Sequence, residues 1–112
     1  MILKDLRHLF NTEVLPKIQR KELLEFVIAS WPPSPRANQP PGTQSQRVEY
    51  WGTEEGRLVK IATVHRYLRQ DGTLGASGLP DPKRVFHDGI VYAPYVEPPS
   101  KDSPLSSGGA SE

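Results

Sequence analysis

Proline divides this chain into two parts. Between Trp31 and Gln46 the sequence reads WPPSPRANQPPGTQSQ, with five prolines and no apolar periodicity. Proline cannot continue a helix interior or donate to the ladder of a central strand, so we expect an extended connector over residues 32–46. The spacing of Pro32 and Pro35 would also fit an aromatic groove that binds polyproline, but a semi-rigid linker is the simpler interpretation. The connector separates two regions whose apolar patterns differ.

Residues 1–31 carry the spacing of amphipathic helices. Apolar residues recur at helical intervals in two runs: Leu3, Leu6, Leu9 and Phe10, then Leu23, Leu24, Val27 and Ile28. Such spacing predicts one buried stripe on each of two helices. Pro16 predicts a break between about Asn11 and Pro16, because proline disrupts a helix interior. The second helix is expected from roughly Pro16 to Ser30, where Pro32 and Pro33 would stop it.

The pattern after the connector favours strands. Residues 47–51 and 57–69 are rich in branched and aromatic side chains, and residues 52–56 are expected to join them as a hairpin. Strict alternation on the second strand would place one set on a common face: Val59, Ile61, Thr63, His65 and Tyr67. Asp88-Gly89 predicts the tight turn of a second hairpin between residues 84–86 and 90–95, in which Pro94 ends the last strand.

These segments together predict an α+β fold. Two N-terminal helical segments are expected to pack on one face of a small antiparallel sheet of about four strands, arranged as a meander of two hairpins. The sheet, over residues 47–96, would form one domain with residues 1–31. Residues 97–112 (EPPSKDSPLSSGGASE) lack the apolar side chains that could offset the entropy of ordering, so they predict a disordered tail.

Composition narrows the classes of function. The 112 residues contain no cysteine, which excludes thiolate metal sites and a cysteine nucleophile and favours a reducing, cytoplasmic setting. Charged residues interrupt the first ten positions, so we expect neither a signal peptide nor an anchor there. No apolar run is long enough for a membrane helix. We expect no membrane partner, no small-molecule cofactor and no metal.

Charge is unevenly distributed along the chain. The net charge of +1 argues against indiscriminate nucleic-acid binding, yet the stretch from Arg57 to Arg84 holds six basic residues and two acids, Asp71 and Asp81. Residues 70–82 form a longer connection than a meander needs, which is typical of working or mobile loops. Its glycine N–H groups and nearby basic side chains could capture an anion, although the same glycines could serve only the turns of the loop. The predicted binding residues are Arg66, Arg69, Gly72, Gly75, Gly78, Lys83 and Arg84.

Two kinds of nuclease are alternatives. A metal-independent ribonuclease, acting as a toxin for example, would use His65 and His87 as acid and base, with Arg66 and Lys83 stabilising the charged phosphate. A metal-dependent nuclease would use the Asp81-Pro82-Lys83 pattern, with further ligands from Asp71 and from Glu22 or Glu25. Pro82 favours a turn over residues 79–83 instead, which argues against the second alternative.

Aromatic residues offer a third kind of surface. They could form a stacking platform for single-stranded bases: Trp31, Trp51, Tyr50, Tyr67, Phe86, Tyr92 and Tyr95. Aromatic residues on strands more commonly pack in a core or against cross-strand neighbours. His8 has no second ligand at helical spacing, so no metal role is expected for it.

The leading hypothesis is a small non-enzymatic binding or regulatory module. Its partner would be a protein or a nucleic acid, engaged through the sheet and the loop over residues 70–82. This hypothesis depends on the basic stretch and on the lack of an evident nucleophile, acid–base or metal constellation in the sequence. The run from Val64 to Arg84 resembles short bacterial reading frames, and no family or activity is attached to that resemblance.

Overall fold

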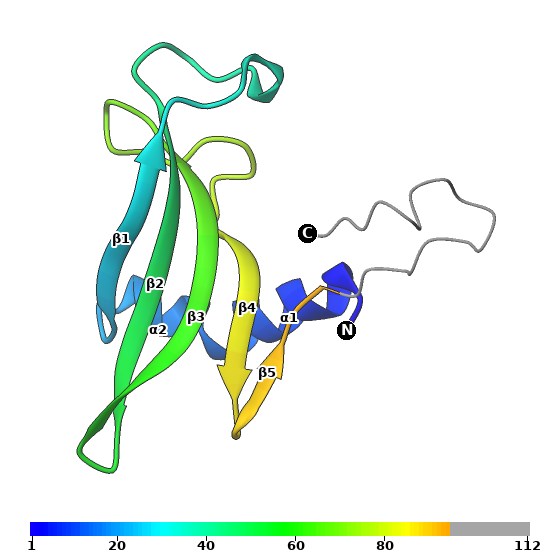
Figure 1. Ribbon diagram of the computed structural model, residues 1–112, viewed down its shortest axis with the longest axis vertical. Helices are drawn as coiled ribbons and strands as arrows, with labels where there is room; N and C mark the ends of the chain where they lie inside the picture. Colours follow the sequence, from blue (N-terminus) through cyan, green and yellow to red (C-terminus); the bar gives the residue numbers. More distant parts are fainter. Residues whose placement is uncertain (95–112) are drawn as a thin grey trace, which may run out of the picture.

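The computed structural model describes residues 1–94, which form two short helices and a five-stranded antiparallel sheet (Figure 1). The helical elements are α1 (Leu3–Glu13), α2 (Leu15–Gln19) and the 3-10 turn η1 (Pro35–Ala37). The strands are β1 (Leu24–Trp31), β2 (Gln44–Glu54), β3 (Arg57–Leu68), β4 (Asp81–His87) and β5 (Ile90–Tyr92). They pair in chain order, β1-β2-β3-β4-β5. The predicted α+β class and antiparallel meander are confirmed, with five strands instead of about four.

The prediction of a helix from Pro16 to Ser30 is wrong over most of its length. Only Leu15–Gln19 is helical, and Leu24–Trp31 forms the edge strand β1 on β2. The apolar spacing in this region fits a helix, but branched and aromatic side chains also suit a strand, and pairing with β2 decides between them. The predicted break is confirmed, because α1 ends at Glu13 and Pro16 lies in the first turn of α2, where its missing N–H costs little.

Two other boundaries differ from the predictions. The connector ends earlier, because β2 already begins at Gln44. The turn expected over residues 79–83 is wrong from Asp81 onward, where β4 begins, and Pro82 pairs with Val64. A bulge between Thr63 and Val64 accommodates Pro82, since a bulge interrupts the regular ladder that needs its N–H. The predicted tail (97–112) and the end of the last predicted strand (95–96) lie outside the described residues.

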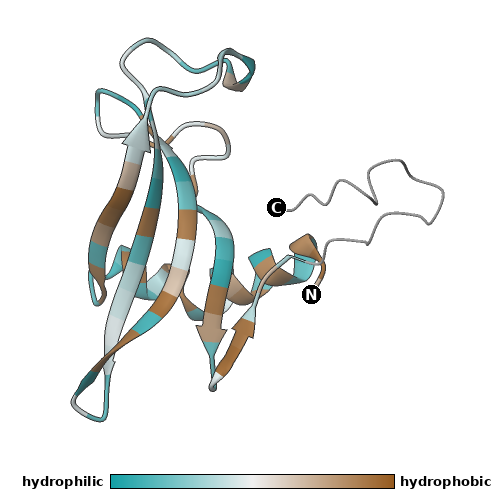
Figure 2. Ribbon diagram, viewed as in Figure 1, coloured by the Kyte–Doolittle hydropathy of each residue, from teal (hydrophilic) through white to brown (hydrophobic). Residues whose placement is uncertain are grey.

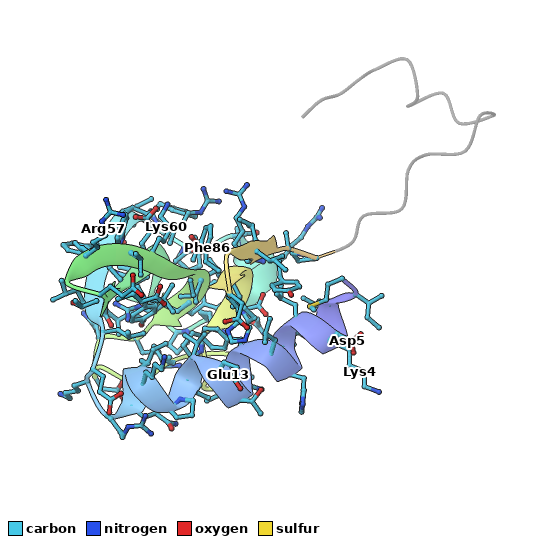
Figure 3. All side chains as sticks on the ribbon, turned by 90° about the horizontal axis from the view of Figure 1, so that it is seen from below. Lys4, Asp5, Glu13, Arg57, Lys60 and Phe86 are labelled. Atoms are coloured by element: carbon cyan, nitrogen blue, oxygen red, sulfur yellow. The ribbon has the colours of Figure 1, made fainter. Side chains whose placement is uncertain are left out.

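The core lies between the helices and one face of the sheet, here called the inner face. Leu6 and Phe10 of α1 are fully buried, and they pack with Val48, Val64 and Val85 from β2, β3 and β4. Figure 3 shows α1 on one side of the sheet and the labelled Lys60 and Phe86 on the opposite side. We call that opposite side the outer face; no helix of the described chain covers it (Figures 1 and 3).

A bulge resets the alternation of side chains along β3. Tyr50 pairs with Ala62, whereas the next residue, Trp51, pairs with Lys60, so Ile61 is an extra residue. As a result Ile61 joins Ala62 in the core, and Lys60 points to the outer face. The prediction that Val59 and Ile61 share a face with Thr63, His65 and Tyr67 is therefore wrong. Within residues 1–94, no helix is long and apolar enough to cross a membrane.

Candidate functional site

A shallow basin of about 400 Å³ lies on the outer face, over β2, β3 and β4. Four cationic side chains line it: Arg47, Lys60, Lys83 and Arg84. Its acidic lining residue is Glu49, whose Oε2 lies 2.9 Å from Lys60 Nζ. This ion pair, together with a hydrogen bond from the Trp51 indole, lowers the pKa of Glu49. The basin is thus strongly positive in spite of the near-neutral charge of the whole chain.

A larger hollow of about 660 Å³ adjoins the basin. It is lined by the loop over residues 75–80, and also by Arg7 of α1, His65 and Arg66 of β3, and Asp81 of β4. Arg47 and Lys83 line both hollows. The two hollows therefore form one continuous surface, which we call the basic cleft.

The acids of the basic cleft are already neutralised. Asp81 accepts from Arg7 and Lys83, each at 3.2 Å, just as Glu49 is paired with Lys60. Within residues 1–94, Arg47 and Arg84 form no ion pair with a carboxylate, and both are exposed. An anion approaching the cleft consequently meets two cations, Arg47 and Arg84, whose charges no carboxylate of the described chain compensates.

The pKa of His65 is affected by the positive charges of the cleft. Its Nε2 lies 2.6 Å from the Ser45 hydroxyl, and its ring meets the edge of Tyr67 with 4.7 Å between centroids. Partial burial lowers the pKa of His65, and the charges of Lys83 and Arg47 lower it further, although Asp81 opposes them. The imidazole is therefore held neutral in the folded protein at neutral pH.

This depressed pKa predicts that acid destabilises the fold through His65. The unfolded chain, with a pKa near the ordinary value of 6.5, binds a proton more readily than the folded one, so stability present above pH 6.5 is lost as pH falls below it. Urea unfolding measured at successive pH values should show this loss in the natural protein. His65→Gln keeps a polar side chain but cannot titrate, and its stability should fall less over the same range; parallel curves would contradict the prediction.

Aromatic rings flank the cationic floor of the basin. Lys60 Nζ lies 5.5 Å from the ring centroid of Trp51 on β2 and 5.8 Å from that of Phe86 on β4. Both rings are half-exposed; Figure 3 shows Phe86 on the outer face, and Trp51 lies there too because it pairs with Lys60. Of the other predicted stacking residues, Trp31 is exposed on β1 and Tyr67 is half-exposed beside His65, whereas Tyr50 and Tyr92 pack in or against the core. Tyr95 lies outside the described residues.

The structure divides the predicted binding residues into two groups. Lys83 and Arg84 are exposed in the basic cleft, and Gly75 lines its larger hollow. Arg66 also lines that hollow, but its charge is used within the protein: its Nε donates to Gln46 at 2.9 Å and its guanidinium lies 3.3 Å from Glu25. Its side chain is 11% exposed, so Arg66 serves a structural network that also includes the Tyr50 hydroxyl. Arg69 opens the loop, with its Nε buried and without a partner in the described chain.

In the loop over residues 70–82, the glycine N–H groups are already hydrogen-bonded within the protein. The N–H groups of Gly72, Gly75 and Gly78 donate to the carbonyls of Arg69, Tyr67 and Gly75, respectively. Gly72 and Gly78 have φ values of +89° and +82°, which other residues rarely adopt. Gly75 lets the Gln39 side chain approach, since a Cβ there would clash with Gln39 Oε1. Of these glycines only Gly75 lines the larger hollow, and the N–H groups of all three are already bonded to backbone carbonyls, so they are not left to form an anion nest.

The two nuclease constellations are not assembled. Asp81 lies opposite His65, and His87 lies six residues farther along β4, which corresponds to roughly 20 Å at the usual rise per strand residue. One phosphate cannot span that separation between an acid and a base. Asp71 accepts hydrogen bonds from Thr73 within its own loop, whereas Glu22 and Glu25 pair with Arg20 and Arg66. Among the described residues, no group of three or more His, Cys, Asp or Glu side chains could hold a metal ion.

The sequence-based site omitted Arg7 and Arg47, which only the tertiary structure brings to the cleft. Arg47 alternates with Glu49 and Trp51 on the outer face of β2, and this alternation was the signal that could have identified it. Arg7 is one of several charged residues on α1, and its sequence pattern does not distinguish it from the others. Comparisons with protein-family models, with curated proteins and with solved structures found no match to this chain.

Proposed function

We propose that this protein is a non-enzymatic module that binds single-stranded nucleic acid along the basic cleft. The observation that carries the proposal is the junction of two hollows at Arg47 and Lys83, because it makes one elongated surface with cations along its length. A row of cations suits a polymer of phosphates, since each contact releases a counterion. Besides Arg66, which is paired with Glu25, the cations of the cleft are Arg7, Arg47, Lys60, Lys83 and Arg84; its two acids, Glu49 and Asp81, are both ion-paired.

The aromatic rings favour a single strand over a duplex. Trp51 and Phe86 stand on the same face as Lys60, so bases could stack on the rings while phosphates contact the neighbouring cations. Stacking contributes about 1–3 kcal/mol per base and requires bases that are not enclosed in a helix. Binding instead of catalysis is favoured because the two histidines are too far apart to act together. A cytoplasmic location fits the cysteine-free sequence.

Direct binding measurements test the proposal. Fluorescence anisotropy should detect binding of a labelled single-stranded oligonucleotide, with weaker binding of the duplex of the same sequence. If about four phosphates are contacted, the logarithm of the association constant should fall with the logarithm of salt concentration with a slope of about −3. A flat salt dependence, or no binding near 100 µM protein, which corresponds to roughly 5 kcal/mol of affinity, would refute the proposal.

An acidic peptide of matched length is the necessary control. Polyglutamate carries the negative charges but no bases, so it can use Arg47 and Lys83 but cannot stack on Trp51 or Phe86. We expect it to bind at least about tenfold more weakly than the oligonucleotide, since one stacked base alone contributes more than 1 kcal/mol. Equal affinity for the two ligands would point to an acidic protein as the partner and contradict nucleic-acid recognition.

A further inference from the structure

The edge strand β1 is apolar and uncovered. Five consecutive residues, Leu24 to Ile28, are exposed, and the values include 52% for Leu24, 46% for Phe26 and 48% for Ile28. Figure 2 shows this apolar stretch of β1 at the border of the sheet. β1 pairs with β2 on one side, and no strand of the described chain pairs with its other side. Within residues 1–94, the outward backbone groups of β1 are therefore open to a further strand.

The strand lacks the usual protection of a sheet edge. Natural edges are commonly guarded by lysine, proline or inward-pointing charges, but β1 reads LEFVIASW and has Glu25 as its single charged residue. Glu25 is paired with Arg66 and accepts a hydrogen bond from Tyr50, so its charge is compensated within the chain. The regular, unguarded part of the edge is the segment from Leu24 to Val27. Ile28 is a bulge residue, since the register on β2 shifts between Val27 and Ala29, and its side chain lines the basin on the outer face.

We infer that β1 pairs with β1 of a second copy of this chain, antiparallel and centred on Phe26. Residues opposite each other in an antiparallel pair point to the same face of the sheet. In β1, Leu24 and Phe26 point to the outer face opposite Trp51 and Glu49, while Glu25 and Val27 point inward opposite Tyr50 and Val48. Only registers that preserve this alternation are allowed. Centring on Phe26 satisfies the rule over the whole exposed segment.

This register makes the segment complementary to itself. Phe26 meets Phe26 of the partner subunit on the two-fold axis, and Leu24 lies opposite Ile28 of the partner subunit. On the inner face Glu25 lies opposite Val27 of the partner subunit, so the two carboxylates are not placed face to face. Aromatic and branched cross-strand pairs are the stabilising kind in antiparallel sheets. An arbitrary foreign strand would need the same pattern by chance, whereas a second copy supplies it by symmetry.

The dimer would also extend the proposed binding surface. The two-fold axis of an antiparallel strand pair is perpendicular to the sheet, so the outer faces of both copies would lie on the same side. Two basic clefts would then face one nucleic-acid strand, and this consequence rests on the proposed function. The pairing itself does not, because it depends only on β1. With so short a paired segment, a dissociation constant in the micromolar range is expected.

The absence of cysteine allows a direct test by disulfide formation. In the full chain, Phe26→Cys would place the two introduced thiols on the two-fold axis, with Cα atoms about 4.5–5.5 Å apart, a separation that a disulfide accepts. The matched control is Leu58→Cys, which is 52% exposed on β3 and remote from the proposed axis. Under mild oxidation Phe26→Cys should form covalent dimer at least roughly ten times faster, owing to the high local thiol concentration. Equal rates for the two variants would overturn the inference.

Sedimentation gives a second, independent readout without any oxidant. The unmodified chain should shift from monomer to dimer as its concentration rises through the micromolar range, and Phe26→Lys should weaken the dimer at least about tenfold by placing two cations together on the axis. Since Phe26 is 46% exposed, this substitution should leave the circular dichroism unchanged. A monomer at every concentration, or open-ended association beyond the dimer, would contradict the inference. Both tests omit nucleic acid, so their failure would leave the basic cleft proposal standing.

Discussion

The double substitution Arg47→Glu and Lys83→Glu is expected to weaken binding of a single-stranded oligonucleotide by roughly a hundredfold at about 0.1 M salt, or about 2.7 kcal/mol. These two residues line both hollows of the basic cleft, so reversing them removes its central phosphate contacts and adds repulsion. Both side chains are exposed, and Arg7 still pairs with Asp81 in the variant, so the fold should persist. Anisotropy titration measures the loss, with circular dichroism as the check on folding.

A charge-matched variant separates the cleft from the net charge. Lys17→Glu and Lys21→Glu change the net charge by the same amount, but these exposed lysines lie on α2 and in the turn that follows it, and neither lines the basic cleft. This variant should lose less than about threefold in affinity, since its changes lie away from the bound phosphates. Comparable losses in the two double variants would mean that overall charge, and not the basic cleft, governs binding.

Phe10→Ala should cause the largest loss of stability among single substitutions of the core, about 4 kcal/mol. The Phe10 side chain is fully buried where α1 meets the inner face, so its removal leaves a cavity between the helix and the sheet. Small domains have few other residues that could compensate, and the loss would consume much of a typical total stability of about 5–15 kcal/mol. Urea unfolding followed by tryptophan fluorescence measures it.

Phe26→Ala is the matched control for this substitution. It removes the same side chain from an exposed strand position, and at low protein concentration it should cost less than about 1 kcal/mol. Because both variants lose a Phe side chain, the difference in their unfolding free energies measures the effect of burial alone. If Phe10→Ala cost no more than Phe26→Ala, the packing of α1 against the sheet would not be what holds the fold together.

Local chemistry made several features predictable. Asp88 and Gly89 both adopt positive φ, +52° and +76°, as expected for the tight turn of a hairpin. The helix break before Pro16 depends on the same kind of local constraint, since proline restricts its own backbone and lacks a donor. The content of branched and aromatic residues likewise predicted the middle of β2, over residues 47–51, and the whole of β3. Each of these features is decided by residues adjacent in the chain, and a sequence pattern records such interactions directly.

The other features of the fold depend on pairing between strands that are distant in the sequence. The segment from Leu24 to Trp31 has spacing that suits a helix and side chains that suit a strand, and hydrogen bonding to β2 selects the strand. The bulges in β3 and β4 could not be foreseen from strict alternation, yet they determine that Lys60 points outward and that Ile61 is buried. Arg47 and Lys83, separated by a long stretch of sequence, become neighbours only through the register of three strands.

In the candidate site, too, some features follow from the sequence and others only from the tertiary structure. The sequence alone determined that basic and aromatic residues are concentrated after the connector, because composition is independent of folding. It could not determine which of them act together. Arg66 and Lys83 look equivalent in the sequence, and both line the cleft, but the Arg66 side chain is 11% exposed and bound to Gln46 and Glu25, whereas the Lys83 side chain is 50% exposed. That difference depends on which side chains strand pairing brings beside each residue, and strand pairing between distant segments is a property of the tertiary structure.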